Sequence, residues 1–253
     1  ALSHFINDVM QSVLSASYPV LQAEFALSFT QIGLMSLAFM GTASVLQPIV
    51  GMVTDRHPFP QSLTLGMGST MLGLFLLAWA PSYALLLTGA ALIGIGSAVF
   101  HPEASRVARA AAGRRFGTAQ SLFQLGGNAG SSAGPLLAAF IVVPFGRGSV
   151  AWFAVMAMIG MTMLSQVGRW YARQERARRK TVAAKHHGLP RRKVIVTIIL
   201  LAFLVFTKNT YIASISTYYT FFLIERFALS TQEAQLMLFL FLGSAAAGVI
   251  LGG

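Results

Sequence analysis

The sequence predicts an all-α membrane protein, with a six-helix bundle followed by the first two helices of a second bundle. Three observations lead to this prediction. The chain of 253 residues is 55% hydrophobic and only 10% charged, whereas soluble proteins carry about 25% charged residues. Long apolar runs recur along its whole length without the alternation of β-strands. A segment near the start also returns 202 residues later.

Eight apolar runs are long enough to cross a hydrocarbon layer of about 30 Å as helices. In chain order they cover roughly residues 1–21, 30–52, 62–80, 83–106, 118–142, 149–169, 194–222 and 233–253. We therefore expect a transmembrane bundle at 1–170, a basic central loop at 171–193, and the first two spans of a second bundle at 194–253. The first run contains Asp8 and lacks a basic leader and a cleavage site, so it does not resemble a signal peptide.

The internal repeat pairs "FALSFTQIGLM" at 25–35 with "FALSTQEAQLM" at 227–237. Extended without gaps, the offset of 202 gives 14 identical pairs over 51 residues. The second copy begins after six spans, an even number, so both copies enter the membrane from the same side. Because the second copy stops at Gly253, the equivalent of Gly51, we expect four further spans to complete the second bundle.

The net charge of +11 is explained by its distribution along the chain. With a cytoplasmic N-terminus, 15 of the 18 basic residues fall in inside loops, so the central loop is predicted to be cytoplasmic. The stretch "RWYARQERARRK" (169–180) could also act as an RNA-binding arm or contact anionic lipid. Its place in the topology already accounts for the charge, so we expect a solvated loop, a lipid bilayer around the protein and no nucleic-acid partner.

The first span carries a continuous polar stripe at helical spacing, made of His4, Asn7, Asp8, Gln11, Ser12 and Ser15. Lipid cannot satisfy these groups, so the stripe must face protein or water, and a carboxylate there is costly. We expect Asp8 to be the main proton carrier, with His4 as a second candidate, and Asn7, Gln11 and Ser15 to line a substrate cavity. The alternative is that Asp8 is a fixed structural acceptor.

The corresponding helix of the second copy keeps a polar stripe and adds a lysine, with cavity candidates Lys208, Asn209 and Tyr211. An ammonium about two turns into an apolar run would attract an anionic substrate. Alternatively, Lys208 extends toward the interface or pairs with an acid such as Asp8.

The fourth span ends in "FHPEASRVAR" (100–109), where charged groups follow an uncharged run. On a straight helix His101 aligns with Ser97, whereas Glu103 lies about 200° away and aligns with Arg106. We expect a salt-bridge network at a cytoplasmic gate, formed by Asp55, Arg56, Glu103 and Arg106; an anion contact at Arg106 is the alternative. His101 is a further proton-coupling candidate.

The fifth span contains "FQLGGNAGSSAGP" (123–135), in which Gly126, Gly130 and Gly134 recur every four residues before Pro135. This spacing predicts close helix packing, and the Lys-Ser/Thr of a phosphate-binding loop is missing. Gln124 and Asn128 are cavity candidates. The loop histidines His57, His186 and His187 have no carboxylate at metal-ligand spacing, cysteine is absent and no catalytic site is recognisable. We therefore expect no metal, no cofactor and no enzyme.

Two motifs resemble signatures of the major facilitator superfamily. "GMVTDR" (51–56) resembles the G-x-x-x-D-[RK] loop signature, although "HPFPQS" replaces its basic continuation, and "GSSAGP" (130–135) resembles the G-x-x-x-G-P antiporter signature. Longer segments, among them "SHFINDVMQS" and "GIGSAVFHPEASRVAR", resemble the fosmidomycin-resistance family of drug exporters within that superfamily.

The resemblance implies a major facilitator fold with a truncated second bundle. It also implies export of small drugs, fosmidomycin among them, across the bacterial inner membrane by proton antiport, and a monomer is expected. Proton-coupled uptake of a nutrient anion or sugar by the same fold is one alternative. A membrane-embedded enzyme is the other, and it lacks recognisable catalytic spacing.

Overall fold

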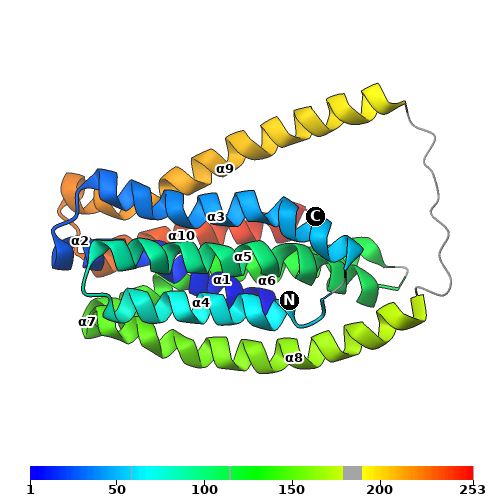
Figure 1. The fold of residues 1–253 in the computed structure, drawn as a ribbon. Helices are drawn as coiled ribbons and strands as arrows, with labels where there is room; N and C mark the ends of the chain where they lie inside the picture. Colours follow the sequence, from blue (N-terminus) through cyan, green and yellow to red (C-terminus); the bar gives the residue numbers. More distant parts are fainter. Residues whose placement is uncertain (58, 114, 179–189, 253) are drawn as a thin grey trace.

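The computed structural model describes residues 1–57, 59–113, 115–178 and 190–252, and these residues form helices and no strands. The all-α prediction is therefore confirmed. Long helices lie side by side in a bundle (Figure 1). In chain order the elements are α1 (Leu2–Ala16), α2 (Tyr18–Phe25), α3 (Phe29–Arg56), α4 (Ser62–Trp79), α5 (Tyr83–Ala111), α6 (Phe116–Leu137), η1 (Ala138–Val142), α7 (Val143–Phe145), η2 (Arg147–Trp152), α8 (Phe153–Arg178), α9 (Arg191–Phe227) and α10 (Thr231–Gly252).

Six segments of the described chain are long and apolar enough to cross a membrane: Phe29–Arg56, Ser62–Trp79, Tyr83–Ala111, Phe116–Phe145, Arg147–Gln174 and Arg192–Phe227. The first predicted run is divided at Ser17 into α1 and α2, because Pro19 lacks the N–H that would continue the helical ladder. The last predicted run forms α10. All eight expected runs thus contain helix, and among the described residues six segments meet the length and hydropathy of a continuous span.

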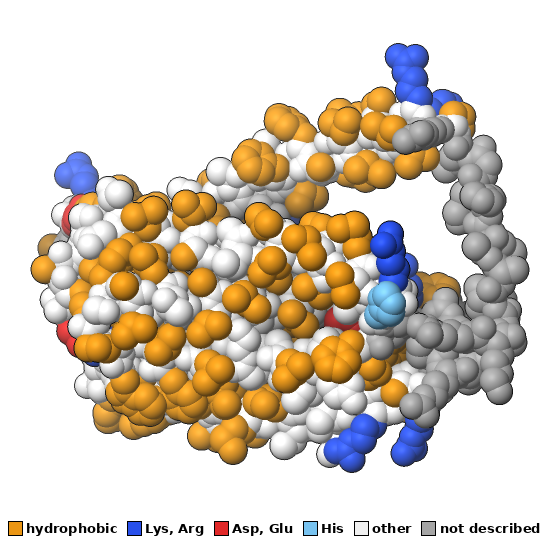
Figure 2. Space-filling model, viewed as in Figure 1, with side chains coloured by type: hydrophobic (Ala, Val, Ile, Leu, Met, Phe, Trp, Pro, Cys, Tyr) orange, Lys and Arg blue, Asp and Glu red, His pale blue; other side chains and the backbone are white. Residues whose placement is uncertain are grey.

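The side of the bundle is apolar. Figure 2 shows hydrophobic side chains covering the length of the helices, with charged groups gathered at the two ends. Exposed side chains such as Leu37 (64%), Val45 (65%) and Leu65 (62%) would be unfavourable in water over so wide an area. A surface of this kind fits a hydrocarbon surrounding, so the protein is a multi-pass membrane protein.

The bundle has α1 at its centre, packed closely against α6. The side chains of Val9, Met10, Val13 and Leu14 are fully buried. The glycine face that spacing predicted on α6 lies against this helix, because a Cβ added at Gly126 or Gly130 would come within 2.4 Å of an α1 carbonyl oxygen. Such contacts allow the two backbones to approach without intervening side chains.

The repeat found in the sequence reappears as two equal turns. Ala26 and Ala228, which are 202 residues apart, both adopt the left-handed conformation, with φ of 50° and 53°. Each turn is followed by a serine that caps the next helix, Ser28 with Gln31 and Ser230 with Glu233. The same cap geometry at equivalent positions shows that α3 and α10 begin in the same way.

The bundle has two ends, which we name by their residues. The loop end holds Arg56, Ala111 and Arg191, and the far end holds Ala26, Gly146 and Ala228. α9 approaches the other helices toward the far end and diverges from them toward the loop end (Figure 1). Its side chains change accordingly, from exposed at Phe203 (63%) and Phe206 (68%) to buried at Phe221 (5%).

Candidate functional site

A cavity of about 170 Å³ lies between the first-half helices and the two helices of the second copy. Its walls come from α1, α2, α3, α6, α9 and α10, and most of the polar lining consists of hydroxyl groups. The lining residues are Asp8, Gln11, Ser12, Leu14, Ser15, Tyr18, Ser36, Phe39, Met40, Ser131, Ile212, Ser216, Thr217 and Leu242. Asp8 is the one acidic or basic side chain among these described residues.

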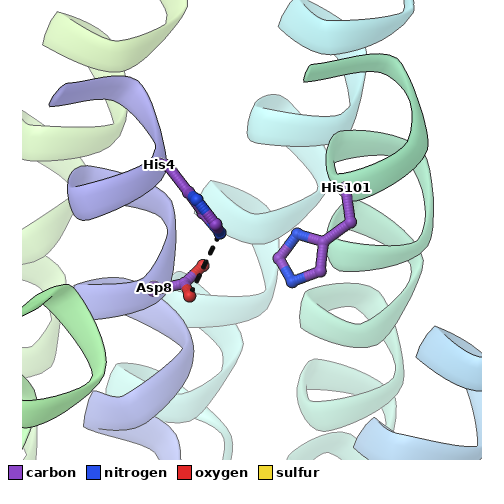
Figure 3. Close-up of side chains that lie close together, drawn as sticks. All are labelled: His4, Asp8 and His101. Atoms are coloured by element: carbon purple, nitrogen blue, oxygen red, sulfur yellow. Dashed lines mark ion pairs between the residues drawn. The ribbon is translucent and has the colours of Figure 1, made fainter. Parts of the chain in front are cut away.

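Asp8 is paired with His4, one turn earlier on α1. The distance from His4 Nε2 to Asp8 Oδ2 is 3.4 Å, and both side chains are largely buried (Figure 3). The other carboxylate oxygen, Oδ1, accepts a hydrogen bond from the Asn7 amide at 2.9 Å. The His4 ring is held from its opposite side, because Nδ1 lies 2.7 Å from the Phe123 carbonyl oxygen and the two rings stack.

These contacts define where a proton can sit. A carbonyl oxygen only accepts, so His4 Nδ1 must carry a hydrogen and donate it to Phe123. The remaining nitrogen, Nε2, then faces a carboxylate oxygen, and the two groups form an ion pair only when the imidazole is protonated.

His101 joins the pair from α5. Its ring centroid is 5.3 Å from that of His4, in an edge-on arrangement (Figure 3), and its buried Nδ1 has no hydrogen-bond partner among the described residues. Ser97, one turn earlier on α5, donates to Gln11 at 3.1 Å. The face of α5 that contains Ser97 and His101 thus lies against the polar stripe of α1.

The cluster also has the composition of a cation site, which the sequence did not predict. His4, Asp8 and His101 each offer one ligand atom, and these atoms lie within 4.8 Å of one another. Sequence spacing could not reveal this group, because the third member comes from another helix. A metal ion and the shared proton would compete for the same lone pairs.

Gly127 leaves the space that the His4–Asp8 pair occupies. The sequence analysis did not identify this residue. A Cβ at this position would lie 2.5 Å from His4 Cε1 and 2.9 Å from Asp8 Oδ2. Only a hydrogen fits there. Gly127 does not belong to the four-residue series of small residues, so only the helix register shows its contact with the pair.

Gln11 and Ser15 line this cavity, whereas the other predicted cavity residues are not among its lining residues. Asn7 is buried behind Asp8, whereas Gln124 is exposed and Asn128 half-buried on α6. Three of the α9 candidates are exposed in this conformation, namely Lys208, Asn209 and Tyr211. Lys208 nevertheless lies on the stripe of α9 that contains the cavity residues Ile212 and Ser216, because these positions are four residues apart.

The predicted network at the loop end is present in part. Arg106 binds Glu103 at 2.6 Å on its own helix and also Asp55 at the end of α3. Glu103 is almost completely buried (1% exposed), while Arg56 is exposed. These contacts join α3 to α5 within the first half. Glu103 pairs with Arg106, whereas His101 lies beside His4, so the two side chains point in different directions, as a straight helix requires.

We expect Arg106→Gln to lower stability by about 3 kcal/mol, because it leaves the buried Glu103 carboxylate without its cation. Thermal unfolding of the purified complete protein measures this change. The double variant Glu103→Gln/Arg106→Gln should recover much of the loss. Asp55→Asn is the matched control and should cost below about 1 kcal/mol, since Asp55 is largely exposed. An equal loss for Asp55→Asn would contradict the role assigned to burial.

A group of hydroxyls joins the two halves toward the far end. Ser36 Oγ donates to Tyr18 Oη at 3.0 Å and lies 3.1 Å from Thr217 Oγ1 on α9. Nearby, the buried Gln235 amide donates to the Ala16 carbonyl oxygen at 2.7 Å. These contacts close the cavity on the far side, and the sequence had not indicated them.

A cavity between two structurally repeated helical halves, lined by hydroxyls and one buried acid, is the arrangement of a membrane transporter. The chain belongs to the Major Facilitator Superfamily, whose family model matches residues 1–253. The resemblance seen in the sequence motifs is confirmed.

Two curated relatives align with the whole chain. One is the fosmidomycin resistance protein of Escherichia coli K12, which is 53% identical over 254 residues. Another is the uncharacterised MFS-type transporter YfnC of Bacillus subtilis 168, which is 37% identical over 257 residues. The chain spans 63% of the length of each of them.

Solved structures share the fold at low sequence identity. A bacterial homologue of the human lysosomal transporter Spinster, in an inward-facing and occupied conformation, matches with a TM-score of 0.66 at 19% identity. That match covers 99% of this chain and 58% of the homologue. Tetrameric PepTSo2 matches with a TM-score of 0.54 at 18% identity, over 86% of this chain and 47% of its own.

Proposed function

We propose that the protein is a secondary active transporter that exports small drugs, fosmidomycin among them, across the bacterial inner membrane by proton antiport. The observation that carries this proposal is the 53% identity with the fosmidomycin resistance protein over the whole chain. The basic loop at 171–193 then lies in the cytoplasm, as the distribution of positive charge favours. The protein acts as a monomer and not as an enzyme.

The proton-coupling part of the proposal is supported by the His4–Asp8 contact. A proton shared by the pair would lie beside the cavity, because Asp8 also lines it. A drug that enters the cavity therefore meets a group whose charge depends on that proton. Release of the proton from one side and uptake from the other would link export to the proton gradient.

The geometry of α9 supports a substrate role for Lys208. Fosmidomycin is a phosphonate and carries negative charge, whereas the cavity has no basic group among its described lining residues. Lys208 lies one turn beyond Ile212 on the cavity-facing stripe, where α9 diverges from the bundle. We propose that it reaches the substrate when α9 closes against α1.

Expression of the complete protein in a drug-sensitive bacterium should raise fosmidomycin tolerance, and a protonophore should abolish the gain. Drug accumulation at verified membrane expression measures export directly. Added chelator should leave export unchanged, because protons and not a metal ion occupy the His4–Asp8 contact. Increased accumulation would instead favour uptake, and protonophore-resistant export would exclude coupling to protons.

A further inference from the structure

A second pocket lies at the loop end, between the start of α4 and the end of α8. It has a volume of about 580 Å³, and its walls include Gln61, Thr64 and Leu65 on one side and Arg169 and Arg173 on the other. It is separate from the transport cavity, with which it shares no lining residue.

The charge of this pocket suits a phosphate group. Arg169 and Arg173 are one helical turn apart, so both guanidinium groups lie on the same face of α8. Guanidinium groups bind phosphate oxygens through paired hydrogen bonds. The opposite wall contains the N-terminus of α4, which begins at Ser62 without a side-chain cap, so its first amide groups contribute positive potential.

The surroundings of the pocket show that its ligand also has a hydrocarbon part. Leu65 lines the pocket and is 62% exposed, and Leu72 continues the same face of α4 at 55%. On α8, Ile159 is 50% exposed above the arginines. Trp170 is 39% exposed beside them, and tryptophan concentrates where hydrocarbon meets water. Figure 2 shows this border, with basic side chains beyond the hydrophobic surface at the loop end.

We propose that this pocket binds the phosphate of an anionic phospholipid, with the acyl chains lying against α4 and α8. The phosphate is held between Arg169 and Arg173 and the first turn of α4. Neither α9 nor α10 contributes to the pocket, so the site belongs to the outer face of the first half.

The test uses the complete protein in nanodiscs of phosphatidylcholine that contain phosphatidylglycerol. Lipids retained after purification are counted by native mass spectrometry. The wild type should retain phosphatidylglycerol in preference, and Arg169→Gln/Arg173→Gln should bind it roughly thirtyfold more weakly, about fivefold per arginine. Arg192→Gln/Lys193→Gln, which removes the same charge at the start of α9, should retain it. Equal retention by all three proteins, or equal loss in both double variants, overturns the proposal.

A further measurement on the wild type keeps the proposal testable if the arginine variant does not fold. Inorganic phosphate at millimolar concentration should not displace the lipid. Full displacement would assign the site to a soluble phosphate and overturn the lipid assignment.

Discussion

Asp8→Asn in the complete protein is expected to reduce proton-driven export to background while leaving substrate binding in place. The asparagine amide has the shape of the carboxylate and can donate to His4 Nε2, which keeps the contact seen here. It cannot gain or lose a proton, so binding and coupling would separate. Drug binding to purified protein and proton-coupled flux in vesicles measure the two properties.

Ser15→Ala is the matched control, because Ser15 lines the same cavity on α1 but cannot carry a proton under these conditions. It should retain most of the coupled flux. Normal coupled export by Asp8→Asn would rule out Asp8 as the proton carrier. A loss of thermal stability in place of coupling would favour the alternative that Asp8 is a structural acceptor. Pairing of Asp8 with Lys208 is not formed in this conformation, where His4 and Asn7 are its partners.

Gly127→Ala is expected to abolish export without lowering helix stability. Alanine is favoured over glycine in a helix by about 1 kcal/mol, yet its Cβ would overlap the space of His4 and Asp8. The His4 ring cannot retreat easily, because it stacks on Phe123 at 3.9 Å and donates to the same residue. Export assays and thermal unfolding of the purified variant measure the two effects.

The control for this prediction is Gly51→Ala, since a Cβ at Gly51 meets no atom within 4 Å. Gly51→Ala should leave export unchanged. If Gly127→Ala exports at the wild-type rate, the pair either adjusts at little cost or is not required. Restored export when His4→Ala is added would show that overlap between the new Cβ and the His4 ring caused the loss of export.

Much of the fold could be predicted because its causes are local in the sequence. Hydropathy located the spans, and the repeat of "FALS" found in the sequence corresponds to equivalent turns at Ala26 and Ala228 in the structure. The opposite directions of His101 and Glu103 followed from helical spacing alone. Each of these predictions needs only the geometry of one helix or the comparison of two segments.

The remaining features depend on how one helix is positioned along another. The Phe123 carbonyl that orients His4, the close approach of Gly127 and the contact between Ser36 and Thr217 all join different helices. A shift of one residue along α6 would replace Gly127 with Asn128 in one direction and with Gly126 in the other. Hydropathy does not determine the position of one helix along another. The sequence therefore indicated His4 and Asp8 as candidates, but not how their side chains contact each other.

The hydroxyl contact among Tyr18, Ser36 and Thr217 has a consequence for conformational equilibria. Each of its hydrogen bonds contributes only about 1 kcal/mol net, because water offers the same groups a replacement. Separating these three hydroxyls therefore costs little, although the Gln235 contact and the packing of Phe29 against Tyr218 and Phe221 also hold the halves together on that side. An equilibrium between two conformations can be inverted by a ligand whose affinities for them differ by a few kcal/mol. Replacing these hydroxyls with bulky apolar groups would instead trap one population, and transport would stop although every binding group remained.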